Sequence, residues 1–196
     1  MRAPLFGRTC LAVLFLLLAA GNASRAESLA VTLEGARVNP FEQASEETLV
    51  FLFVAVECPI SNRFAPSVNA IYEQYASKDL AMWTVYTDDL FSVGDVRKHR
   101  TDYQYRNPAL LDFEHRLAKH CGASVTPEAV VFVREGPGAY RMVYRGRIDN
   151  QYVDFGKWRL KATRQDLREV LDAVRAGEAA SLELRTTEAI GCYIGE

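Results

Sequence analysis

The sequence predicts an α/β protein with a central mixed β-sheet flanked by helices. Residues 49–56 form an unbroken apolar run of strand length, rich in β-branched and aromatic side chains, as expected for a strand covered on both faces. Apolar residues then recur at helical spacing over residues 60–76, and a second apolar run follows at 80–86. A strand, a helix and a strand with such short connections predict a parallel unit with a right-handed crossover.

The later segments continue this pattern. We expect helices over 93–103, 112–120 and 165–176, a short strand at 109–111, and a hairpin of strands 129–133 and 140–144. The last helix places Leu167, Val170, Leu171 and Val174 on one face. The first strong element begins at residue 49, and the tail from residue 178 has no clear helix or strand pattern.

The N-terminal segment has the organisation of a secretory signal peptide. Arg2 and Arg8 precede an apolar run over residues 10–20, and small residues around Ala26 follow. That run is about half of the ~20 residues that a bilayer-spanning helix needs. We therefore expect a signal peptide at 1–26, one domain at 27–177 and a tail at 178–196, in a protein exported to the periplasm or the extracellular space with no membrane association after cleavage.

Composition and charge narrow the function further. The chain has 196 residues, 49% of them hydrophobic and 24% charged, which is typical of a globular protein. Removal of residues 1–26 would shift the formal charge from −2 to about −5, so a nucleic-acid partner is not expected. The remaining cysteines are Cys58, Cys121 and Cys192, and an odd number in an exported chain implies a thiol that is free, reactive or paired with another molecule.

Cys58 is the candidate nucleophile. It follows the first buried strand, and Pro59 fits the first helical turn, so Cys58 is expected at or next to the N-cap. A helix N-terminus lowers the pKa of a thiol from ~8.5 to between ~3.5 and 7.5. The Ser61 hydroxyl would support the sulfur, whereas the Glu57 carboxylate would oppose its ionisation if it pointed inward. The alternative is that Cys58 is a buried structural cysteine.

An oxidised Cys58 needs a second thiol to resolve it. Ser61 stands where a local second cysteine would close a one-turn disulfide, so the partner must come from elsewhere. Cys192 lies on a tail that could return to the site, and it is our first choice. Cys121 ends a predicted helix and is either a less favoured partner or a small buried hydrophobe, and an external thiol is the third alternative.

Three further features leave their role open. His115 and His120 have the wrong helical spacing for shared metal ligation, so no metal site is expected and a solvated helix face is the better interpretation. Arg145 and Arg147 either approach Cys58 or form a solvated strand edge. The aromatic segment 150–161 either covers the site or caps the core.

Several motifs together resemble a known family. They are Cys58-Pro59-Ile60-Ser61-Asn62-Arg63, Leu110-Leu111-Asp112, Val125-Thr126-Pro127-Glu128, Tyr144-Arg145-Gly146-Arg147-Ile148-Asp149 and Gly191-Cys192. The chain resembles the thioredoxin fold, and more narrowly the redoxin branch related to the alkyl hydroperoxide reductase/thiol-specific antioxidant proteins. The resemblance implies a cis Pro127 packed against the active cysteine, with the Thr126 backbone left to pair with an extended substrate segment.

The chain also departs from that pattern. Ser61 replaces the second cysteine of thioredoxins, and Phe51 and Ala55 occupy the Pro and Thr places of the typical peroxiredoxin motif. The expected function is an exported thiol–disulfide oxidoreductase acting through Cys58 without metal or organic cofactor. Its expected partners are protein thiols or disulfides or small peroxides, with an external thiol as reductant. The alternatives are a thiol peroxidase that reduces hydroperoxides, or a redox-silent binding module that uses the Thr126–Pro127 edge.

Overall fold

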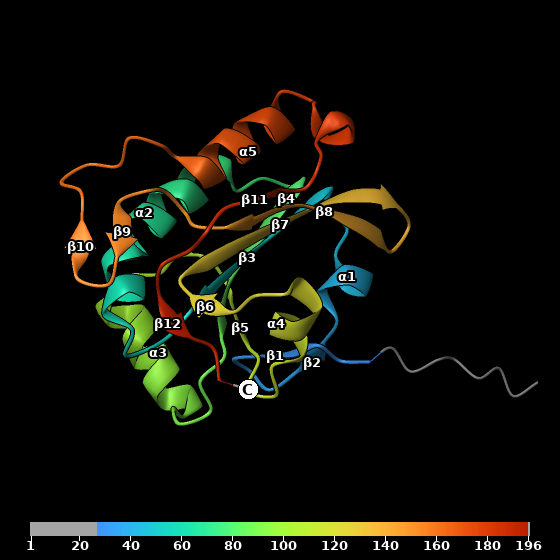
Figure 1. The fold of residues 1–196 in the computed structure, drawn as a ribbon. Helices are drawn as coiled ribbons and strands as arrows, with labels where there is room; N and C mark the ends of the chain where they lie inside the picture. The colour runs from blue at the N-terminus through green and yellow to red at the C-terminus, as the bar shows by residue number, and fades with distance from the viewer. Residues whose placement is uncertain (1–26, 196) are drawn as a thin grey trace, which may run out of the picture.

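A mixed eight-stranded sheet forms the centre of the protein in a computed structural model that describes residues 27–195. The strand order is β11-β8-β7-β3-β4-β5-β1-β2 (Figure 1). The three central parallel strands are β3 (Thr48–Val54), β4 (Leu80–Tyr86) and β5 (Ala109–Leu111). Antiparallel pairs extend the sheet through β7 (Glu128–Gly136) and β8 (Ala139–Gly146). The predicted mixed sheet is confirmed, and the expected signal peptide at 1–26 lies outside the described residues.

Helices cover both faces of this sheet. Helices α2 (Pro59–Tyr75) and α5 (Asp166–Arg175) lie together on one face, and α1 (Pro40–Gln43) and α4 (Arg116–Cys121) lie on the other (Figure 1). Helix α3 (Val93–Asp102) packs through Val96 against the ends of β3 and β4. Within residues 27–195, none of the helices is long and apolar enough to cross a membrane.

The central position of β3 explains its unbroken apolar sequence. Every residue of β3 is buried, because β4 and β7 flank it and helices cover both of its faces. Val50 and Leu52 pack in the core under α2 and α5, whereas Phe51 and Phe53 pack in the core under α1 and α4. Because β3 is fixed in the centre of the sheet, the start of the loop that follows it and carries Cys58 is fixed as well.

The chain before residue 48 is more ordered than the sequence indicated. It forms β1 (Ala30–Thr32), β2 (Arg37–Val38) and α1. Strand β1 extends the sheet by pairing with β5, and Phe41 anchors α1 with its ring 4.9 Å from that of Phe132. Elements of two to four residues are too short to show a hydrophobic period, so the sequence contained no signal for them.

The predicted helix at 112–120 starts later than expected. Helix α4 begins at Arg116, because the Asp112 carboxylate accepts hydrogen bonds from the amides of Leu117 (3.2 Å) and Ala118 (2.7 Å). His115 takes a left-handed conformation with φ of 55° just before the helix. Asp112 therefore stabilises the helix from outside it.

The aromatic segment 150–161 caps α2. It forms a small hairpin of β9 (Tyr152–Asp154) and β10 (Lys157–Trp158). The Tyr152 ring lies 5.8 Å from that of Phe64, and the Arg63 guanidinium lies 4.6 Å from the centre of the Trp158 ring. Of the two roles left open for this segment, the structure shows the capping one.

The tail folds back along the domain. After a 3-10 turn, η1 (Ala179–Ser181), it forms β11 (Arg185–Thr186), parallel to β8, and β12 (Cys192–Tyr193), antiparallel to β6 (Val125–Thr126). Figure 1 shows it descending from α5 past β11 to lie beside β6. The prediction that the tail has no helix or strand is therefore corrected. Its two-residue strands form only by pairing with β8 and β6, and they are too short to leave a hydrophobic pattern in the sequence.

Candidate active site

Cys58 lies at the junction of β3 and α2 and is 2% exposed. It is the N-cap residue of α2, and its Sγ accepts a hydrogen bond from the amide of Ser61 at 3.5 Å. Pro59 occupies the first helical position, where its missing N–H costs nothing. The Ser61 amide and the positive end of a 17-residue helix therefore favour the anion of the sulfur.

The structure brings Cys192, and not Cys121, to Cys58. The Cys58 and Cys192 sulfurs lie 2.7 Å apart, closer than in an ordinary thiol–thiol hydrogen bond, with the Cys192 thiol as the donor, and both residues are free thiols. Cys121 is fully buried in the core beneath α1 and α4, and this burial raises the pKa of its thiol well above the usual value. Cys121 therefore has the environment of a small buried hydrophobe.

Thr126 and Pro127 complete the surroundings of the sulfur. The Thr126 carbonyl oxygen lies 3.1 Å from Cys58 Sγ and accepts the thiol proton when Cys58 is neutral. The Thr126–Pro127 peptide is cis. The buried Glu128 carboxylate accepts hydrogen bonds from the amides of Ser124 (2.8 Å) and Val125 (3.4 Å). These bonds hold the turn that places Thr126 beside Cys58.

The two thiols have opposite pKa shifts. Burial opposes ionisation of Cys58, but hydrogen bonds donated by Cys192 and by the Ser61 amide outweigh it, and the pKa of Cys58 is lowered. Burial raises the pKa of Cys192 to about 12, assisted by its hydrogen bond to Cys58 and by the negative charge that Cys58 acquires. The pair therefore holds one proton, on Cys192, when Cys58 is a thiolate.

Ser61 contacts the Cys58 sulfur through its backbone amide. Its hydroxyl oxygen is buried and has no hydrogen-bond partner among the described residues. The Ser61 side chain nevertheless adds to the hydrogen bonding that lowers the pKa of Cys58, as the smallest of the contributions, so support of the sulfur by this hydroxyl stays a prediction.

A network of hydrogen bonds between polar side chains supports the loop before Cys58, and it was not predicted from the sequence. The Asn62 side chain donates to the Val56 carbonyl (3.0 Å) and accepts from His99 Nε2 (2.7 Å), while Nδ1 of His99 faces the Tyr86 hydroxyl at 3.0 Å. Burial lowers the pKa of His99 to about 4, so the ring is neutral at pH 7. The only sequence signal was the spacing of His99 three residues after Val96, on the same helical face.

A cavity of about 440 Å³ opens in front of the two sulfurs. Its lining includes Ala55, Glu57, Cys58, Thr87, Asp88, Asp89, Leu90, His115, Thr126, Cys192, Tyr193, Ile194 and Gly195. Neither Arg145 nor Arg147 reaches it: Arg145 binds the Gly122 carbonyl at 2.9 Å, and Arg147 forms an ion pair with Asp166 at 2.7 Å. The carboxylates of the lining make the approach to Cys58 acidic.

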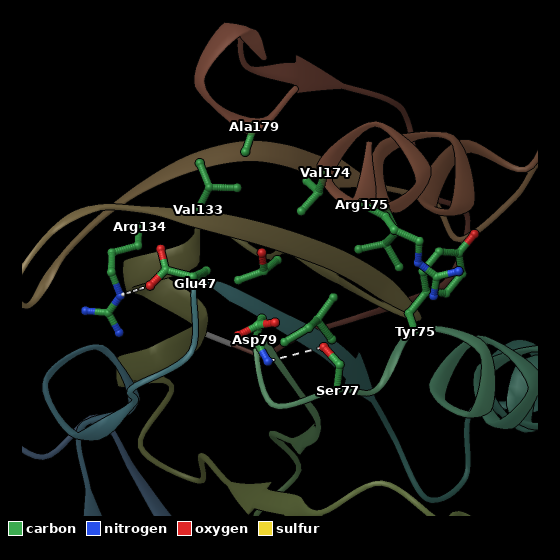
Figure 2. Close-up of a pocket in the computed structure, with 12 residues that line it drawn as sticks. Glu47, Tyr75, Ser77, Asp79, Val133, Arg134, Val174, Arg175 and Ala179 are labelled. Atoms are coloured by element: carbon green, nitrogen blue, oxygen red, sulfur yellow. Dashed lines mark hydrogen bonds and ion pairs between the residues drawn. The ribbon is translucent and has the colours of Figure 1, made fainter. Parts of the chain in front are cut away.

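A second hollow lies at the opposite end of β3, where Thr48 starts the strand (Figure 2). Two polar pairs lie within it: Arg134 faces Glu47 at 3.4 Å, and the Ser77 hydroxyl accepts a hydrogen bond from the Asp79 amide at 3.2 Å (Figure 2). It is lined by no cysteine. Across residues 27–195, no group of three or more His, Cys, Asp or Glu side chains is arranged to hold a metal ion.

Comparison with solved structures gives a consistent fold. An uncharacterized conserved protein from Geobacillus kaustophilus matches with a TM-score of 0.72 at 23% identity, covering 87% of this chain and 89% of that one. A hypothetical protein, SMc02350, from Sinorhizobium meliloti 1021 matches with a TM-score of 0.66 at 27% identity, covering 87% and 91%. A secreted Mycobacterium tuberculosis disulfide oxidoreductase homologous to E. coli DsbE matches with a TM-score of 0.51 at 19% identity, covering 74% and 93%. The fold is thioredoxin-like.

Comparison with protein families gives one assignment. None of the curated proteins matches the chain. The model of the AhpC/TSA family matches residues 24–144, a range that contains Cys58, Thr126 and Pro127. The match spans more than half of the sequence and agrees with the motifs and with the fold. The chain therefore belongs to the AhpC/TSA family.

Proposed function

We propose that the protein is a thiol oxidoreductase in which Cys58 is the nucleophile and Cys192 is the resolving thiol of the same chain. The observation that carries this proposal is the 2.7 Å separation of the two sulfurs together with the opposite shifts of their pKa values. A lowered pKa makes Cys58 a thiolate at lower pH than an ordinary cysteine. A thiol in hydrogen-bond contact is already placed to complete the exchange.

The reaction with a disulfide balances without any cofactor. The Cys58 thiolate attacks one sulfur of the substrate disulfide, and the other sulfur leaves as a thiolate that takes up a proton. Cys192 then loses its proton and attacks Cys58 Sγ, which expels the second substrate thiol. Two electrons pass from the two cysteines to the substrate, and the protein is left with a Cys58–Cys192 disulfide that an external dithiol reduces.

The raised pKa of Cys192 imposes an order on these steps. Burial is the largest of its three causes, and the other two, the hydrogen bond to Cys58 and the charge of Cys58, are strongest while Cys58 is a thiolate. Once Cys58 has formed a mixed disulfide, only burial remains to oppose ionisation of Cys192. Cys192 therefore ionises more readily, and is the better nucleophile, after Cys58 has reacted than before.

A hydroperoxide is the second candidate oxidant, because family membership supports it. The Cys58 thiolate would take the terminal oxygen to form a sulfenic acid with release of an alcohol or water, and Cys192 would then close the disulfide with loss of water. Phe51 and Ala55 in place of the usual Pro and Thr, and a cavity lining without arginine or lysine, favour a disulfide over a hydroperoxide as substrate.

The test is the fate of the cysteines after oxidation. Reduced protein is treated separately with hydroxyethyl disulfide and with hydrogen peroxide, alkylated and mapped by mass spectrometry. We expect a Cys58–Cys192 linkage in wild type and in Cys121→Ser, and a Cys58 mixed disulfide or sulfenic acid in Cys192→Ser. Cys58 that stays unmodified by both reagents at neutral pH would contradict the proposal and favour the redox-silent binding module. The faster of the two reagents identifies the type of oxidant.

Export is part of this proposal. The charged, apolar and small-residue regions of 1–26 support a cleaved signal peptide, and the likeness to a secreted M. tuberculosis oxidoreductase agrees with it. Oxidising compartments are where an intrachain disulfide persists. We expect N-terminal sequencing of the exported protein to begin at Glu27, and a sequence that begins within or before residues 10–20 would show a retained segment instead.

A further inference from the structure

Strand β12 occupies the backbone edge next to Cys58. Cys192 pairs with Thr126 and Tyr193 with Val125 in antiparallel register, and the Ile194 amide donates to the Ser124 carbonyl at 3.0 Å. The Thr126 hydroxyl also donates to the Cys192 carbonyl at 3.4 Å. The family resemblance implies that the Thr126 backbone is free to pair with an extended substrate. In this structure the protein's own tail pairs with it instead.

This tail strand is anchored on both sides of Cys192. Ile190 packs against the core under α2 and α5, and Ile194 packs against the core under α1 and α4. Gly191 makes the close approach between them: a Cβ at this position would lie 2.1 Å from the Thr126 carbonyl oxygen, which is backbone and cannot move aside. The contacts fix the strand across the end of the sheet (Figure 1).

With the tail in place, the two sulfurs are still reached through the cavity in front of them. The cavity of about 440 Å³ reaches both Cys58 and Cys192 with β12 in place, and its volume falls in the range of small-molecule sites. A polypeptide that reacts through its cysteine in the thioredoxin manner would need the Thr126 backbone as a strand partner. A small disulfide or hydroperoxide needs only the cavity.

We infer that residues 190–195 act as a built-in substitute for a substrate strand, so that Cys58 exchanges with small disulfides or hydroperoxides and excludes extended polypeptides. This inference rests on the proposed function, because it assigns the substrate class of the same cysteine pair. An external peptide has to compete with a segment that is covalently attached and therefore present at high effective concentration. The tail thus sets specificity as well as supplying the resolving thiol.

The test compares two probes that carry the same leaving group. One is 2-hydroxyethyl 2-pyridyl disulfide, and the other is an extended ten-residue peptide with one cysteine activated as the 2-pyridyl disulfide. Pyridine-2-thione release gives the rate of each. The proteins are full-length Cys192→Ser, in which the tail strand is retained, and the double variants Gly191→Ala/Cys192→Ser and Gly136→Ala/Cys192→Ser. Gly136 is the matched control, because a Cβ there meets nothing within 4 Å.

We expect Cys192→Ser to react with the small probe at least about tenfold faster than with the peptide probe, because the attached tail strand keeps its advantage. Gly191→Ala should displace the strand and reduce this ratio several-fold, and Gly136→Ala should leave it unchanged. A ratio near one in Cys192→Ser, or an equal ratio in the two double variants, would overturn the inference. If Gly191→Ala fails to fold, the ratio in Cys192→Ser alone decides. Cys58 that reacts with neither probe would instead contradict the proposed function.

Discussion

At the scale of single residues, the character of Cys58 comes from which atoms donate to its sulfur. The Ser61 amide and the Cys192 thiol stabilise the anion, whereas burial and the Thr126 carbonyl at 3.1 Å favour the neutral thiol. The balance lowers the pKa of Cys58. Since one of the donors is itself a reactant, removing the resolving thiol should also change the nucleophile.

This predicts a pH effect of substitutions at Cys192. The rate of Cys58 alkylation follows the thiolate fraction and therefore rises as pH rises through the pKa of Cys58. Cys192→Ala removes a donor, so the midpoint of this rise should move up by about one pH unit, the equivalent of one hydrogen bond to a charged group. Cys192→Ser retains a hydroxyl donor and should stay near wild type. Equal midpoints for the Ala and Ser variants would show that the donated bond does not set the pKa.

A second prediction concerns the Ser61 hydroxyl. Because it is buried without a partner, Ser61→Ala should leave stability unchanged or raise it by about 1 kcal/mol, since an unsatisfied buried hydroxyl carries a desolvation cost. The amide that contacts the sulfur is retained, and the Ser61 side chain is the smallest of the contributions that lower the pKa of Cys58, so the alkylation midpoint should rise only slightly. Urea unfolding and alkylation measure the two effects. A clear upward shift of the midpoint would show that the hydroxyl reaches the sulfur in solution.

The sequence was informative about residues whose role is local. Cys58 and Pro59 are adjacent at a strand–helix junction, and the structure has Cys58 at the N-cap that this junction predicts. The choice between Cys192 and Cys121 was not local, because 134 positions separate Cys192 from Cys58. The sequence reading favoured Cys192, and the structure brings its sulfur to Cys58 by the pairing of two-residue strands that leave no hydrophobic period.

At the scale of elements, the loop between β3 and α2 is held from the side by α3. Asn62 at the start of α2 connects the Val56 carbonyl to His99 of α3, and His99 in turn contacts Tyr86 at the end of β4. Three elements therefore meet at a neutral, buried imidazole directly behind the Cys58 loop. Long elements such as β3, α2, β4 and α5 were predictable from their periodicity, but this polar junction was not, because it depends on how α3 packs.

The junction should make stability depend on pH. The pKa of folded His99 is lowered to about 4, so between about pH 6.5 and 4 the unfolded chain binds a proton that the folded protein does not. His99 should therefore destabilise the fold progressively as pH falls, by roughly 2 kcal/mol between pH 7 and pH 4.5. His99→Gln should be less stable than wild type at pH 7 but should lack this component. Urea unfolding at both pH values measures it, and an equal pH dependence in the two proteins would contradict the assignment.

At the scale of the whole molecule, charge is distributed unevenly around the site. Glu57, Asp88 and Asp89 line the cavity in front of Cys58, and no arginine or lysine is among its lining residues. An anionic substrate therefore approaches against a repulsive field, while a neutral one does not.

We expect glutathione disulfide to react with Cys58 several-fold more slowly than neutral hydroxyethyl disulfide at low ionic strength, with the gap narrowing as salt screens the charges. Asp88→Asn/Asp89→Asn should raise the rate of the anionic substrate alone. Asp79→Asn, in the hollow at the far end of β3, is the matched control and should change neither rate. Stopped-flow measurements of both disulfides at two salt concentrations give the result, and a rate ratio independent of salt and of these substitutions would contradict it.

The position of Cys192 close to the chain end has a mechanical consequence. A disulfide between Cys58 and Cys192, which are 134 positions apart, would close most of the folded domain into one covalent ring. Closing a ring of this size removes unfolded-state entropy worth about 5 kcal/mol. The oxidised form should thus melt at a markedly higher temperature than the reduced form, and the same free energy should bias the cysteine pair toward its oxidised state. Each catalytic cycle would therefore alternately raise and lower the stability of the whole fold.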